Sequence, residues 1–153
     1  MAIVTQKSGS SRVSVQITGW KEIGAQLERL PIEVRGPELE KAIRKSLNRI
    51  KTRAKQLVPP PGYPGDKPGK KPLRDTIGVV LRRYKGGAVI AGVVGPEYPA
   101  GAHGHLVEHG TAPHGKHPGS KPHPFMAPAV ADVAPHIESD IVAALQKAAE
   151  KSG

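Results

Sequence analysis

The sequence contains no cysteine among its 153 residues, so disulfide bonds and thiolate metal sites are excluded. It has only one Trp, three Tyr and one Phe, which leaves little aromatic material for a core. No apolar run approaches the ~20 residues that a membrane-spanning helix needs. Residues 1–7 also lack the charged-then-apolar layout of a secretory signal. We therefore expect a chain made in the cytoplasm, with no membrane partner.

Glycine, proline and positive charge are abundant instead. The chain has 18 Gly and 16 Pro, which predicts long loops that become ordered on assembly rather than a compact enzyme core. Lysine and arginine number 23 against 13 acidic residues, a formal charge of +10. Such an excess favours a polyanionic neighbour, either nucleic acid or an acidic protein surface, although it can also serve solubility.

The chain is expected to begin with a flexible N-terminal extension and to continue as a single α+β domain. Residues 1–11 end in a Lys-Ser-Gly-Ser-Ser run and are predicted to be this flexible N-terminal arm, whereas residues 12–153 form the domain. Residues 12–18 alternate polar and apolar side chains, which predicts a half-buried strand. Residues 20–30 carry apolar side chains at helical spacing, which predicts a short amphipathic helix.

The clearest helix is predicted over residues 37–58. Pro37 suits the first turn, and prolines 59–61 end the helix sharply. Its apolar stripe comprises Leu39, Ile43, Leu47, Ile50, Ala54 and Leu57. Its other faces carry Lys41, Arg44, Lys45, Arg49, Lys51, Arg53 and Lys55. We expect this helix to pack on a sheet and to present a basic surface.

The second half is predicted to form a hairpin, two extended loops and a final helix. Residues 59–72 and 110–124 are too rich in proline and glycine for regular structure and are expected to be extended loops. Residues 73–84 and 88–94 are expected to be paired strands, joined by a Lys-Gly-Gly turn. Residues 105–108 suit either a short strand or one helical turn. The final helix is expected over about residues 127–150, and Pro135 either kinks it or marks its start.

Residues 105–109 (HLVEH) match an inverted zinc-protease pattern, in which two histidines bind metal and the glutamate activates water. Gly104, Gly110 and Pro113 surround the segment, so no long supporting helix is expected. Adventitious metal binding by the histidine-rich loop, or a plain polar role in the loop, are the alternatives to catalysis. Phosphate-binding loops, a Gly-x-Ser-x-Gly elbow and an evident carboxylate pair are all missing from the sequence.

Several short motifs occur in an order that resembles the HK97 gp10-like family of tailed-phage neck and tail-completion, or head–tail joining, proteins. The motifs are residues 54–59 (AKQLVP), 71–77 (KPLRDTI), 94–96 (VGP), 106–111 (LVEHGT) and 122–129 (PHPFMAPA). The similarity extends over roughly residues 20–150. Two departures are the 59–72 loop, which replaces a short turn, and His109, which stands where an aromatic residue is common.

The resemblance implies a structural virion protein at the neck or tail, made in the host bacterial cytoplasm, with no enzymatic activity and no cofactor. It implies a homo-oligomeric ring, hexamer or dodecamer, with a central channel for packaged double-stranded DNA, bound nonspecifically. The expected protein partners are head-completion or connector proteins and tail-terminator or tail-tube proteins. A free, sequence-nonspecific nucleic-acid-binding protein is the main alternative, and a zinc-dependent hydrolase is the other.

Two sets of residues are predicted to make contacts in such a ring. The predicted subunit interface comprises Glu108, His109, Gly110, Thr111, Pro124, Phe125 and Met126. The predicted basic loop, facing the channel or another ring, comprises Lys67, Lys70 and Lys71. For Glu108, a bond to a cation or to backbone donors is expected. For Phe125, anchoring in a neighbour's pocket and packing in the chain's own core are both open.

Overall fold

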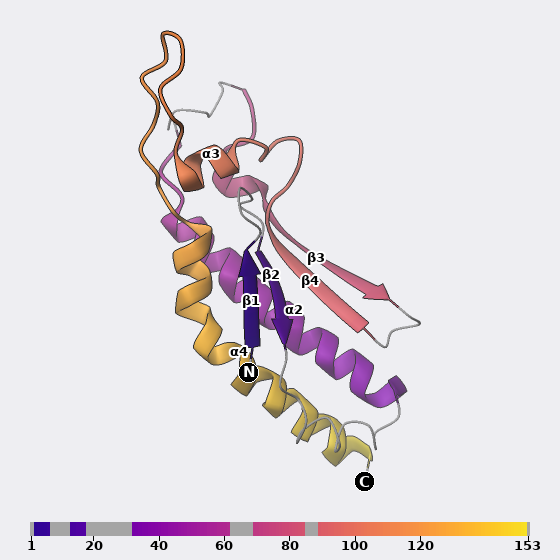
Figure 1. The fold of residues 1–153 in the computed structure, drawn as a ribbon. Coiled ribbons are helices and arrows are strands. Elements are labelled where there is room, and N and C mark those ends of the chain that lie inside the picture. Colours follow the sequence, from indigo (N-terminus) through magenta and orange to yellow (C-terminus); the bar gives the residue numbers. More distant parts are fainter. Residues whose placement is uncertain (1, 7–12, 18–31, 62–68, 85–88, 153) are drawn as a thin grey trace.

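A computed structural model of the chain describes residues 2–6, 13–17, 32–61, 69–84 and 89–152. It shows an α+β fold, with a four-stranded antiparallel sheet beside two long helices (Figure 1). In chain order the elements are β1 (Ala2–Gln6), β2 (Val13–Ile17), α2 (Ile32–Leu57), the short 3-10 helix η1 (Leu73–Thr76), β3 (Ile77–Tyr84), β4 (Val89–Pro96), α3 (Gly104–His109) and α4 (Met126–Ser152). Their order across the sheet is β1-β2-β4-β3.

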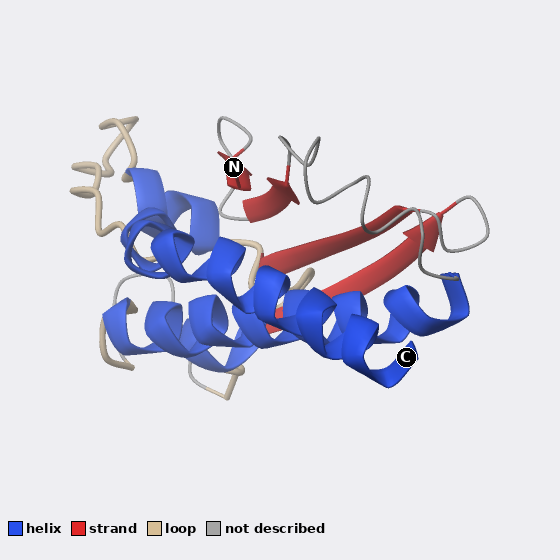
Figure 2. Ribbon diagram, turned by 90° about the horizontal axis from the view of Figure 1, so that it is seen from below, coloured by secondary structure: helices blue, strands red, loops and turns tan. Residues whose placement is uncertain are grey.

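Strands β3 and β4 form the predicted hairpin. Their register runs from Ile77 opposite Pro96 to Tyr84 opposite Val89. Side chains alternate along β3, so that Val79 and Leu81 pack toward the core while Val80 is exposed. Figure 2 shows the long helices lying on one side of these strands. The helices therefore cover one face of the hairpin, and Val80 is exposed on the other.

Helix α2 covers the inner face of the sheet with the predicted apolar stripe. Leu47 and Ile50 are fully buried, and Leu39 and Ile43 pack partly buried against the same core. A Cβ added to Gly92 of β4 would lie 2.3 Å from a Leu47 methyl carbon. Glycine at this position therefore lets the helix approach the strand closely.

Helix α2 begins at Ile32, five residues before the start predicted at Pro37, so that Pro37 lies inside the helix. The proline lacks an N–H and therefore removes one i→i−4 hydrogen bond from the second turn of the helix. The other end agrees with the prediction, since the helix stops at Leu57 before the prolines.

Helix α4 runs antiparallel beside α2, as the pairings of Arg53 with Asp132 and of Glu38 with Lys151 require. Pro135 lies within this helix, so it does not mark its start. The buried side chains of α4 that join the common core are Met126, Ala129, Val130, Val133, Ile137, Ile141 and Leu145. None of the helices in the described ranges combines the length and apolarity that crossing a bilayer requires.

Two local features differ from the sequence predictions, and a third decides between two predicted alternatives. Residues 2–6, predicted to belong to a flexible arm, form β1, which pairs with β2 along its whole length. Residues 73–76, predicted to be strand, form η1, in which the Thr76 hydroxyl donates to the Leu73 carbonyl at 2.7 Å. Residues 105–108, for which strand and helix were both open, are helical. The predicted helix over 20–30 and the turn at 85–87 lie outside the described residues.

Candidate functional site

The predicted interface segment is organised by the Glu108 carboxylate. Glu108 lies on α3 and is 2% exposed. Its Oε2 accepts hydrogen bonds from the backbone N–H groups of Phe125 at 2.8 Å and Met126 at 2.9 Å. Its Oε1 accepts one from Ala127 N–H at 3.0 Å. These donors are at the start of α4, where N–H groups lack intrahelical partners and the helix dipole favours a negative charge.

Phe125 and Met126 are fully buried in the chain's own core. Of the two roles that were open for Phe125, the structure therefore shows packing in its own core rather than a side chain presented to a neighbour. The bonds to Glu108 fix the backbone of both residues at the point where the Pro-rich segment becomes α4. Both residues therefore anchor the end of the exposed segment that precedes them.

The remaining predicted interface residues lie at the two ends of that exposed segment. His109 and Pro124 are exposed, and Gly110 and Thr111 are partly exposed. Gly110 has a φ of 72°, and a Cβ at this position would lie 2.5 Å from the Ser120 carbonyl oxygen, so the turn requires glycine. The structure therefore brings these residues together with the buried Glu108.

The zinc-hydrolase hypothesis requires Glu108 to face a metal-bound water. In the structure both carboxylate oxygens are instead engaged by backbone donors in a buried position. His105 and His109 are exposed on α3, and the His105 Nδ1 lies 2.7 Å from the Ala102 carbonyl oxygen. Among the described residues, no group of three or more possible ligands gathers around a metal position. The Glu108 carboxylate instead joins α3 to the start of α4 through its bonds to the N–H groups of residues 125–127, an arrangement here called the clasp.

The predicted basic loop is described only at its end. Lys70 and Lys71 are exposed, and Lys67 lies outside the described residues. The Arg74 guanidinium donates to the Val58 carbonyl at 3.4 Å, which joins η1 to the end of α2. Lys70 and Lys71 therefore lie at the end of the molecule where α2 stops and α4 begins.

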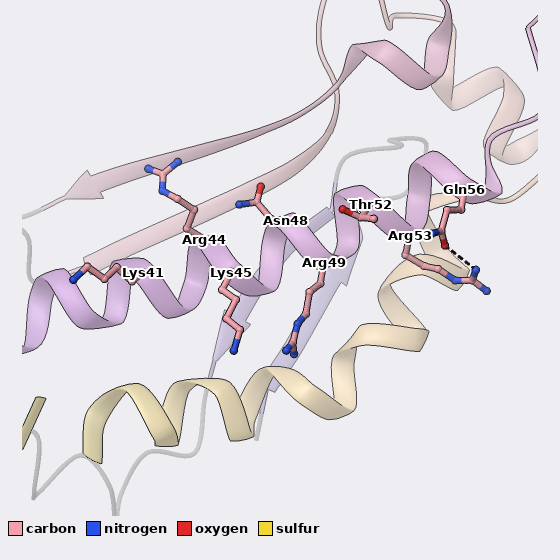
Figure 3. A pocket seen from close by; sticks show the side chains of 8 residues that line it. All are labelled: Lys41, Arg44, Lys45, Asn48, Arg49, Thr52, Arg53 and Gln56. Carbon is pink, nitrogen blue, oxygen red and sulfur yellow. Dashed lines mark hydrogen bonds between the residues drawn. The ribbon is translucent and has the colours of Figure 1, made fainter. Parts of the chain in front are cut away.

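A second basic region is a shallow groove of about 640 Å³ along α2 (Figure 3). The residues that line it are Lys41, Arg44, Lys45, Asn48, Arg49, Thr52, Arg53 and Gln56. Lys45 and Arg49 point toward α4, whereas Arg44 points to the opposite side. The groove is the surface on which the sequence predicted exposed positive charge.

Acidic side chains of α4 neutralise much of this groove. Asp140 accepts from the Lys45 ammonium at 3.0 Å and from the Arg49 guanidinium at 2.6 Å. Asp132 accepts from the Arg53 Nε at 2.6 Å. Salt bridges of this kind contribute only about 0–1 kcal/mol each when exposed, but they cancel the field that a polyanion would feel.

Glu38 and Glu40, near the start of α2, neutralise the remaining groove cations. Glu38 accepts from Lys151 of α4 at 2.7 Å and from Lys41 at 3.2 Å, and these bonds, the one from Lys151 most of all, lower the pKa of its carboxyl. Arg83 of β3 is the main cause of the lowered pKa of Glu40, with a smaller contribution from Arg44. Both glutamates therefore remain charged below their ordinary titration range.

Neither these acidic partners nor the ordered structure of residues 110–124 was predicted from the sequence. Asp132 and Asp140 are eight positions apart on α4, and their spacing along one helix face is the signal that was available. The pairing itself depends on the antiparallel packing of α4 on α2. Within residues 110–124, backbone hydrogen bonds between Thr111 and Ser120 build a ladder that hydrophobic alternation does not predict.

Comparison with known families gives one result. The model of the HK97-gp10-like family, described as a tail component of bacteriophage, matches residues 21–110, which is more than half of the chain. The match includes α2, the β3–β4 hairpin and α3 with Glu108, and it ends where the exposed segment begins. No curated protein and no solved structure matches the chain.

Proposed function

The chain belongs to the HK97-gp10-like family of bacteriophage tail components, and on that premise we propose that it forms a homo-oligomeric ring at the head–tail junction or the top of the tail. The single observation that carries the proposal is the family match over residues 21–110. As a structural tail protein it acts together with other virion proteins. The proposal adds three features to this role: the ring, its position, and a central channel through which double-stranded DNA passes.

The shape of the subunit supports a role in assembly. Residues 110–124 project beyond the packed helices, and α3 and the start of α4 fix their two ends (Figure 1). In a ring, the exposed His109 and Pro124 and the partly exposed Thr111 would lie near a neighbouring subunit, while the buried Phe125 and Met126 support them from within. Closed cyclic symmetry would repeat the same contact at every subunit boundary.

Lys70 and Lys71, together with Lys67, are proposed to face the channel or an adjacent ring. The two described lysines are exposed, and no salt bridge joins either of them to an acidic residue in the described part of the chain. As far as the described residues are concerned, their charge is available to a polyanion or to an acidic protein surface. The expected protein partners are head-completion or connector proteins on one side and tail-terminator or tail-tube proteins on the other.

The test is electron microscopy of particles produced without this chain. We expect filled heads separated from tails, or tails of abnormal length, with normal particles restored by supplying the wild-type chain. Supplying a chain with Glu108→Ala should restore them poorly, because the clasp at the start of α4 is lost. Normal, joined particles in the absence of the chain would refute the proposal.

A further inference from the structure

Residues 110–124, here called the arm, form a narrow two-stranded ribbon. Thr111 and Ser120 exchange two backbone hydrogen bonds of 3.0 Å, and their hydroxyls are 3.0 Å apart. Nearer the tip, His114 N–H donates to the His117 carbonyl at 3.0 Å, and the reverse bond measures 2.9 Å. The two imidazole rings stack with centroids 5.1 Å apart. The arm is thus an ordered hairpin.

The base of the arm is fixed to the body on both sides. Glu108 binds the N–H groups that follow the arm, and His123 N–H donates to the Val107 carbonyl at 2.8 Å. A Cβ on Gly119, which has a φ of 80°, would lie 2.5 Å from the Thr111 carbonyl oxygen. The two sides of the ribbon therefore lie as close together as glycine allows. A ligand that binds the arm meets a preorganised surface.

The arm is basic and contains no acidic residue. Between Glu108 and Asp132 the sequence has no Asp or Glu at all. Lys116 stands at the exposed tip and Lys121 on the exposed return side. Neither lysine forms a salt bridge with any acid that the structure describes. Within the part of the chain that the structure describes, the positive charge of the arm is therefore not cancelled, in contrast with the groove on α2.

We infer that the arm is a sequence-nonspecific contact for the phosphate backbone of double-stranded DNA. The inference rests on the proposed function, which places DNA next to the ring, and it assigns the contact to a segment for which a subunit interface was predicted. Lysine ammonium groups, backbone N–H groups and Ser and Thr hydroxyls are the donors that bind phosphate oxygens in such complexes. A two-stranded ribbon is also narrow enough to enter the major groove.

The composition of the arm favours DNA over a protein partner. Protein interfaces are enriched in Tyr, Trp, Phe, Met and Arg and depleted in Lys and Ser. The exposed residues of the arm, 112–118 and 121–124, include none of the enriched residue types. Pro113 and Pro118 lack backbone N–H groups, which hinders pairing of the ribbon with a strand of another protein. Phosphate contacts, by contrast, need neither an aromatic anchor nor a free strand edge.

The test measures binding of the full-length chain to a short fluorescent DNA duplex by anisotropy, at several salt concentrations between about 50 and 200 mM. In the double variant Lys116→Gln/Lys121→Gln, we expect affinity to fall roughly tenfold or more at about 0.1 M salt. The slope of log affinity against log salt should become shallower by about 2. A duplex of scrambled sequence should give the same values.

The matched control is Lys51→Gln/Lys147→Gln, which removes the same charge from α2 and α4. It should keep most of the wild-type affinity and slope, and both variants should melt like the wild type. Equal losses in the two double variants would show a general charge effect and overturn the inference. So would a wild-type chain that fails to bind duplex even at about 50 mM salt.

These results are separable from those on the proposed function. If the chain is needed for joined particles but the arm variant binds DNA like the control, the ring proposal stands and the arm inference fails. If the arm binds DNA as expected but particles form normally without the chain, the proposed function fails. In that case the chain would be a free DNA-binding protein.

Discussion

The groove along α2 and the arm, both basic, differ in what surrounds their charges. Along α2, Lys45, Arg49 and Arg53 lie within 3.0 Å of acids on α4. Much of their charge is therefore neutralised by ion pairs between the two long helices. On the arm, Lys116 and Lys121 stand on a ribbon that has no acid. A count of positive residues along the sequence ranks α2 first, whereas the structure ranks the arm first. Local net charge, rather than the number of cations, decides which surface attracts a polyanion.

The largest effect is expected from Glu108→Ala, which removes the support of the arm. Three backbone donors at the start of α4 would lose their acceptor next to the buried Phe125 and Met126. We expect the free energy of unfolding to fall by about 2–4 kcal/mol, measured by urea denaturation. Glu108→Gln, which keeps one acceptor oxygen, should lose less. A loss as small as that of the exposed Glu150→Ala would contradict the clasp.

Removing the acids that neutralise the groove should make the groove attract DNA more strongly, as the arm is proposed to do. Asp132→Asn/Asp140→Asn leaves Arg53, Lys45 and Arg49 without their carboxylates. We expect stability to fall by about 1 kcal/mol, because the cations are largely exposed. Duplex affinity at low salt should rise severalfold, because three cations become available.

The control for that experiment is Asp75→Asn/Glu150→Gln, which changes the net charge equally at exposed positions away from the groove. Its duplex affinity should rise much less. An equal rise in the two variants would mean that total charge, not its local pairing, determines the affinity.

A pH dependence should report the ion pairs at the start of α2. The cations beside Glu38 and Glu40 lower both pKa values below the ordinary 4.5. The stability that these pairs provide is therefore fully present above pH 4.5 and is lost as the pH falls through the lowered folded-state values. Glu38→Gln/Glu40→Gln should flatten the decrease in unfolding free energy between about pH 6 and pH 3. An unchanged pH profile in this double variant would show that these ion pairs do not stabilise the fold. Glu150→Gln serves as the control.

The smallest effect is expected from Gly119→Ala, which alters the arm without changing its charge. The added Cβ would meet the Thr111 carbonyl oxygen at 2.5 Å and the Pro113 nitrogen at 2.9 Å. We expect faster hydrogen exchange at the Thr111 and Ser120 amides and a melting temperature that is almost unchanged, because the arm is outside the core. Gly115→Ala also has a positive φ but meets no atom within 4 Å, so it should disturb these amides less.

The parts of the fold that the sequence predicted well are those with a repeating apolar pattern. The stripe of α2 through Leu47 and Ile50 and the alternation of β3 at Val79 and Leu81 are local patterns that core packing preserves. Strand β1 was missed because its few residues depend on pairing with β2, which a local pattern does not show. The early start of α2 was missed because a proline usually marks a helix boundary, yet Pro37 is accommodated inside.

The candidate site was predicted less completely, because its contacts join residues that are distant in the sequence. Glu108 was identified as a tie to a cation or to backbone donors, but the donors lie 17 to 19 residues further on and are backbone groups that every sequence has. The pairing of Arg49 with Asp140 bridges 91 positions and exists only through the packing of α4 on α2. The lack of acidic residues in the arm, by contrast, can be read directly from the sequence.

Quantitative mass spectrometry of purified particles would show whether this chain is a structural component of the tail. We expect the chain to remain bound through density-gradient purification, at a constant copy number equal to one ring in every particle. A chain that is absent from purified particles, or whose amount varies with the purification conditions, would not be a structural component.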